Sequence, residues 1–194
     1  MSSEISLEDA LSLFGSTDAD EFTLGLNVLF RSYINRKEVW DAFVKLVVDN
    51  PACDIPRTLI YYLAHIPWHP DIAWTGDEAI SPETREFGRK LFRQRFGRRE
   101  LIKLLECIDE NGIDRGSIGQ SVVAIIDCLD ESGPMLASVS RDRSLPVATR
   151  EGATLIIAMR YGSDAIPISM ELAQSGSETF ASKLISILRQ RGRV

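Results

Sequence analysis

A tripeptide that recurs after 65 residues is the strongest constraint on how this chain folds. Thr84-Arg85-Glu86 returns as Thr149-Arg150-Glu151, and a weaker copy, Ser117 to Ser121, lies between them. A small residue follows at a fixed place in each copy, at intervals of 33 and then 32 residues: Gly88, Ser121 and Ala153. Periods of about 20 to 50 residues indicate stacked supersecondary units. The repeat therefore predicts close helix contacts at these three positions.

The segments before and within the repeat have helical periodicity. Capping patterns at Ser6, Asp18 and Asn35 and apolar residues at a 3.6-residue spacing predict helices over 6–14, 18–34 and 37–49. A further helix starts at Asp54-Ile55-Pro56 and runs to Ala64, followed by an irregular loop to about residue 80. We expect helix pairs, broken at Gly97, Gly133-Pro134 and Gly162-Ser163, over 81–96 with 99–109, 116–130 with 135–141, and 146–161 with 164–174. A last helix is expected over 178–190.

The best-formed copy is Pro146 to Ala153, followed by Gly162-Ser163-Asp164-Ala165-Ile166-Pro167. It resembles the HEAT and HEAT-like repeat family, whose first helix typically carries Val-Arg-x-x-Ala and whose second helix often begins Ala-x-Pro. The resemblance covers about residues 81–192, with Thr149 in place of the usual valine and Ile118 where the middle copy should have arginine. It implies an all-α, right-handed α-solenoid of stacked antiparallel helix pairs, with second helices lining a concave surface and structural roles for Arg85 and Arg150.

Composition predicts a single domain, 1–194, with N-terminal helices and an aromatic loop in 1–80 and repeats in 81–192. The 194 residues are 44% apolar, enough for one continuous core. No run of about 18 apolar residues is present and the N-terminus lacks a signal pattern, so we expect a cytoplasmic protein without membrane contact. Cys53, Cys107 and Cys128 are widely spaced, which favours reduced, buried thiols over disulfides or zinc.

The chain offers little for catalysis. Its two histidines, His65 and His69, are four residues apart, but Pro67 separates them and no cysteine pair lies nearby. No nucleophile elbow or glycine-rich phosphate loop appears. We therefore expect a protein that is not an enzyme and holds no catalytic residues, metal or cofactor.

Charge is uneven along the chain. Residues 1–80 carry 13 acids and 5 bases, whereas residues 81–103 carry 3 acids and 8 bases. The basic segment, residues 85–103, fits either a nucleic-acid stripe or a solvated helix face that pairs with the acidic N-terminal part of the same chain. Because the net charge is −6, a polyanion would be repelled, which favours the second interpretation and makes nucleic acid an unlikely partner.

The loop after residue 66 is rich in large rings. Trp68, His69 and Trp74 lie in this irregular segment. Large rings are frequent hot spots of protein interfaces, but these rings would equally well fold back and plug the end of a core. Both interpretations stay open.

These observations predict a helical-repeat protein that binds another protein. Its most specific form is a bacterial immunity or antitoxin-type inhibitor of a toxin; the alternatives are a HEAT-like adaptor, a module similar to the HEAT-like phycobilin lyases, or a nucleic-acid binder. The resemblance places second helices on the concave side, so the partner-binding surface is expected to include Trp68, His69, Trp74, Lys103, Glu106, Glu110, Arg141 and Glu171.

Overall fold

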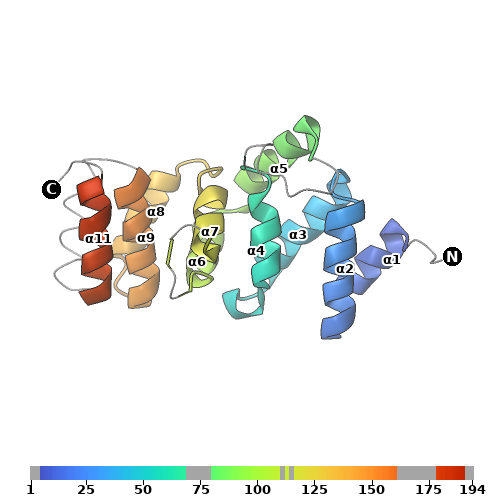
Figure 1. The fold of residues 1–194 in the computed structure, drawn as a ribbon, viewed down its shortest axis with the longest axis horizontal. Coiled ribbons are helices and arrows are strands. Elements are labelled where there is room, and N and C mark those ends of the chain that lie inside the picture. Colours follow the sequence, from blue (N-terminus) through green and yellow to red (C-terminus); the bar gives the residue numbers. More distant parts are fainter. Residues whose placement is uncertain (1–4, 69–79, 110–111, 114–115, 161–177, 191–194) are drawn as a thin grey trace. The chain divides into compact units, whose positions relative to one another are not determined.

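The computed structural model describes residues 5–68, 80–109, 112–113, 116–160 and 178–190. Every regular element in these ranges is a helix (Figure 1), which confirms the predicted all-α class. The right-handed stacking of HEAT-like pairs stays a prediction. By its internal contacts the chain divides into two compact units, Met1–Arg95 and Phe96–Val194.

The first unit contains five α-helices and one 3-10 turn within its described residues: α1 (Leu7–Phe14), α2 (Ala19–Ser32), α3 (Lys37–Asp49), η1 (Ala52–Asp54), α4 (Arg57–Ala64) and α5 (Pro82–Arg95). Two predicted caps are confirmed. The Ser6 hydroxyl accepts a hydrogen bond from the backbone N–H of Asp9, and the Asp18 carboxylate accepts two from the first turn of α2. These side chains satisfy N–H groups that have no partner within the helix.

The predicted cap at Asn35 is wrong. Helix α3 follows Arg36, whose side chain makes no capping bond. The Asn35 side-chain oxygen instead accepts a hydrogen bond of 2.8 Å from the backbone N–H of Ser81, and the Ser81 hydroxyl accepts one from Thr84. The Asn35 amide, which the local pattern predicts as the cap of α3, therefore binds a residue 46 positions away in the sequence.

Two glycines of the first unit allow close helix packing. A Cβ added to Gly25 would lie 2.3 Å from the backbone nitrogen of Phe14, so α2 crosses α1 at a distance that no larger residue permits. A Cβ added to Gly88 would lie 2.5 Å from Cδ1 of Ile66, the second residue after α4. Gly88 is buried, as the repeat predicts.

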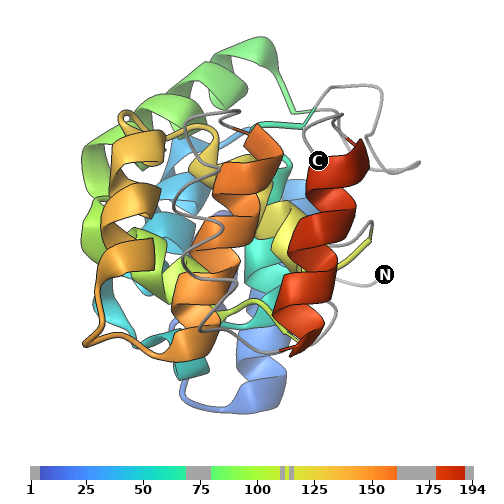
Figure 2. The same cartoon turned by 90° about the vertical axis from the view of Figure 1, so that its left-hand side faces the viewer.

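The second unit is also helical in its described part: α6 (Arg98–Glu106), α7 (Ile118–Ile126), α8 (Ser132–Arg141), α9 (Val147–Arg160) and α11 (Glu178–Gln190). Helix α9 packs against α8 and α11, and α6 contacts α7, α8 and α9. Figures 1 and 2 show α9 and α11 side by side. An ion pair of 2.5 Å between Asp127 and Arg160 joins the ends of α7 and α9. Burial raises the pKa of Asp127, while Arg160 acts in the opposite direction.

Helix boundaries in the second unit correct one prediction and support another. The predicted break at Gly133-Pro134 is wrong, because both residues lie in the first turn of α8, where proline needs no N–H partner. The chain reverses instead at Glu131, whose φ of 54° is left-handed. The last helix has the expected bounds, and the segment 164–174 lies outside the described residues.

The other two small repeat residues are buried as well, with Ser121 1% and Ala153 0% exposed. Gly152 behaves differently. A Cβ there would lie 3.7 Å from Ile108 and 3.8 Å from Leu105, an ordinary van der Waals distance. Close packing therefore does not explain the glycine at this helical position.

These environments predict opposite effects for one substitution. Gly25→Ala should destabilise the protein by about 1 to 3 kcal/mol or more, because the methyl group overlaps backbone atoms. Gly152→Ala should stabilise it by about 0.5 to 1 kcal/mol, because alanine has the better helix propensity and the space is free. Urea denaturation of both variants measures the two changes. Equal effects would contradict the packing described for α1 and α2.

Candidate partner-binding groove

The structure describes four of the eight residues expected at a partner-binding surface. His69, Trp74, Glu110 and Glu171 lie outside the described residues. Glu106 and Arg141 are exposed, as expected. Lys103 is only 7% exposed, so its assignment to an open surface is corrected: this position of α6 faces the interior together with Leu104.

Glu106 lies at a cavity of about 390 Å³ within the second unit, between α6, α9 and α11. Volumes of about 300 to 1,000 Å³ are typical of binding sites. The apolar side chains around it are Leu105, Ile108, Leu155 and Phe180, and the charged ones are Glu106, Asp109, Glu151 and Lys183. Pro146, Ala148, Thr149 and two glycines complete its lining. We call this cavity the α6–α9–α11 groove.

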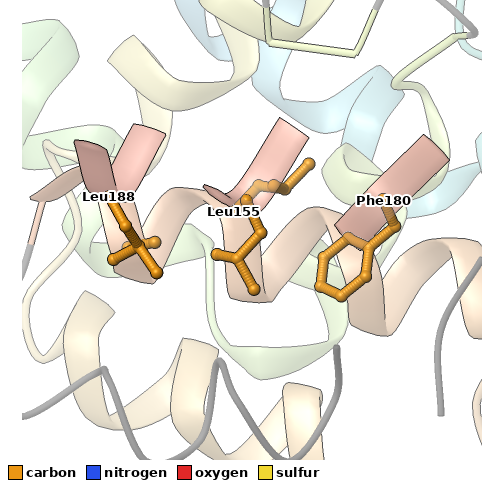
Figure 3. Packing of buried hydrophobic residues seen from close by; sticks show 5 residues of the cluster. Leu155, Phe180 and Leu188 are labelled. Carbon is orange, nitrogen blue, oxygen red and sulfur yellow. The ribbon is translucent and has the colours of Figure 1, made fainter. Parts of the chain in front are cut away.

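An apolar cluster holds the two helices that form most of the groove. Phe180, Leu184 and Leu188 recur every four residues on α11, and they pack with Leu155 and Ala158 of α9 (Figure 3). All five are at most 6% exposed. Burial of this many apolar side chains fixes the spacing of α9 and α11, so the groove is preformed.

Glycines shape the end of the groove at the loop before α7. Gly112 has a φ of 60°, and a Cβ there would lie 3.0 Å from Nζ of Lys183. A Cβ on Gly119 would lie 1.9 Å from the carbonyl oxygen of Gly112, so α7 starts directly against this loop. The Ser117 hydroxyl donates a hydrogen bond of 3.0 Å to the same carbonyl. The loop is thereby held against α7, with the ammonium of Lys183 beside it.

Sequence reasoning identified only Glu106 among the charged residues of the groove. It did not identify Asp109, Glu151 or Lys183 as residues of one site. The signal available was the second copy of the tripeptide, which places Glu151 in the first turns of α9 next to Gly152. The missing information was which helices meet, because the lining comes from three separate parts of the chain, at α6, α9 and α11.

The basic segment does not form a continuous stripe. Arg85 and Lys103 are buried, at 6% and 7% exposure. Arg98 forms an ion pair of 2.5 Å with Asp142 at the end of α8. Hydrogen bonds from Ser144 and then from Arg98 lower the pKa of Asp142. Three of the eight basic side chains thus make contacts within the protein, although the ion pair of Arg98 is with Asp142 and not with the acidic N-terminal part that was expected.

Arg85 binds the end of α4. Its guanidinium donates hydrogen bonds to the carbonyl oxygens of His65 at 2.5 Å, Trp68 at 2.6 Å and Ile66 at 3.3 Å. These carbonyls belong to residues that follow Ala64, the last residue of α4, so the cation also lies near the negative end of the helix dipole, where positive charge is stabilising. Burial, and then the charge of Arg89, lowers the pKa of Arg85. The structural role implied by the family resemblance agrees with these contacts.

Trp68 packs back onto the first unit. Its ring centroid lies 5.5 Å from that of Tyr61 and 5.2 Å from that of His65, and the side chain is half-buried. His65 is 7% exposed and also meets the edge of Phe30. These contacts favour a packing role for Trp68. His69 and Trp74 fall outside the described residues.

No protein-family model matches the chain, and searches of curated proteins and of solved structures found no match. The HEAT-like resemblance therefore rests on the residues that carry it. Among the described residues, no three histidine, cysteine, aspartate or glutamate side chains are grouped so as to hold a metal ion. None of the described helices is long and apolar enough to cross a membrane.

The contacts of Arg85 predict a large stability effect. Arg85→Met should cost about 2 to 4 kcal/mol, because it leaves buried carbonyl oxygens without a donor. Arg95→Met removes the same charge from an exposed position of the same helix and should change stability by less than about 0.5 kcal/mol. Urea denaturation compares the two. If both variants lose the same stability, Arg85 acts only through the net charge.

Trp68→Ala should lower the free energy of unfolding by about 1 to 3 kcal/mol, because the ring leaves its contacts with Tyr61 and His65. Thermal melting followed by circular dichroism measures the loss. Unchanged melting would show that the ring contributes little to folding, which would favour its alternative role as an anchor for a partner.

Proposed function

We propose that this protein binds another protein and that the α6–α9–α11 groove is the docking site. The observation that carries the proposal is the groove itself, a cavity of about 390 Å³ with an apolar interior and charged side chains around it. Protein interfaces commonly combine a central apolar region with a polar rim. The immunity or antitoxin-type inhibitor expected from the sequence is the narrowest form of this proposal.

Exposed apolar surface beside the groove supports a macromolecular partner. Val147, at the start of α9, is 52% exposed, and its neighbours Pro146 and Ala148 line the groove. Ile185 of α11 is also exposed, at 43%, but it does not line the groove. A partner that covers Val147 as well as the groove would bury more apolar area than a small ligand held inside the cavity.

Site-specific photo-crosslinking tests the proposal in the cells from which the protein comes. Benzoylphenylalanine at Ala148 lies in the groove, whereas the same residue at exposed Arg143 lies outside its lining. We expect a covalent adduct with one polypeptide from position 148 and none from position 143. An adduct at Arg141 as well would extend the surface to α8. The proposal fails if position 148 yields no polypeptide adduct while a position outside the groove does.

A further inference from the structure

The charged side chains of the groove indicate what kind of partner segment it would bind. This inference rests on the proposed function. Among the described residues that line the cavity are three carboxylates, those of Glu106, Asp109 and Glu151, and one ammonium, that of Lys183. Within this described lining, Lys183 offsets one negative charge, and two remain in excess. Glu106 is exposed at the end of α6, so a partner reaches this carboxylate without displacing other groups.

Apolar and acidic groups alternate around the same cavity. Leu105 precedes Glu106, and Ile108 precedes Asp109; Leu155 lies one helical turn after Glu151. An apolar side chain that enters the groove beside Leu105 and Ile108 would therefore have carboxylates close to it. Burial of that side chain would supply affinity, and charges near the rim would supply orientation and rate of association.

We propose that the groove binds a segment of the partner polypeptide in which a large apolar side chain is flanked by lysine or arginine. The excess negative charge disfavours an acidic segment, and the net charge of −6 disfavours nucleic acid. Arginine suits the site best, because its planar guanidinium binds carboxylates through two hydrogen bonds.

Selection from a random peptide library tests this composition without presupposing one sequence. Displayed peptides of about 12 residues, which extend over roughly 40 Å, are selected on the full chain. Peptides that also bind the Gly152→Phe variant are discarded. In this variant a ring fills the space beside Leu105 and Ile108, so a peptide that still binds does not depend on the groove. Ala148→Trp, at an exposed lining position, is the second blocked variant should Gly152→Phe fold poorly.

We expect the groove-dependent peptides to combine lysine or arginine with a leucine, isoleucine, phenylalanine or methionine. The best of them should bind Glu106→Arg roughly tenfold more weakly than the unchanged protein, since like charges would meet. Glu86→Arg, the same change at an exposed position of α5, should leave the affinity unchanged.

The possible results distinguish failure of this inference from failure of the proposed function. Groove-dependent peptides that are acidic, or that lack a large apolar residue, overturn the inference and leave the docking site standing. Equal losses in Glu106→Arg and Glu86→Arg also overturn it, because the effect would then follow net charge alone. If neither blocked variant distinguishes any selected peptide from the unchanged protein, the groove does not bind polypeptide and the proposed function fails.

Discussion

The guanidinium of Arg85 is the interaction on which the first unit depends. It gathers the carbonyl oxygens of His65, Ile66 and Trp68, which follow α4, and so holds α5 against the end of that helix. Gly88 lies one turn later, and a Cβ there would lie 2.5 Å from Cδ1 of Ile66, so a larger residue would displace the Ile66 side chain. The backbone of Ser81 binds Asn35 at the start of α5. Helix α5 is thus held by three kinds of contact: the hydrogen bonds of the charged Arg85, the close packing of Gly88, and the hydrogen bond between Ser81 and the Asn35 side chain.

The second unit is organised by apolar burial rather than by one polar group. The cluster around Leu155 and Phe180 joins α9 to α11, and the tight contact of Gly112 with Gly119 sets α7 against the preceding loop. A groove remains between these helices because most of their apolar residues pack against other parts of the unit. Its acidic character then follows from side chains on solvent-facing positions of α6 and α9, which the packing of the core leaves free to vary.

Helices with strong periodicity and local caps were predictable from the sequence, as Ser6, Asp18 and the bounds of α11 show. Failures occurred where a distant contact overrode a local pattern. Asn35 binds a residue 46 positions away, and α6 turns Lys103 inward. Glycine and proline at 133–134 signal a break, yet they suit the first turn of α8 equally well. The groove itself was not predictable, because periodicity within a helix does not say which helices become neighbours.

The division of the chain has a consequence for dissecting it. The repeat in the sequence begins at Ser81 and would pair α5 with α6, but α5 packs on α3 and belongs to the unit that ends at Arg95. A fragment cut at residue 80 would strip the first unit of the helix that carries Arg85 and Gly88, and would leave the carbonyls after α4 bare. A cut after Arg95 would leave the contacts of Arg85 and of Gly88 intact. The start of the sequence repeat, at Ser81, and the boundary between the two compact units, after Arg95, therefore differ by one helix, α5.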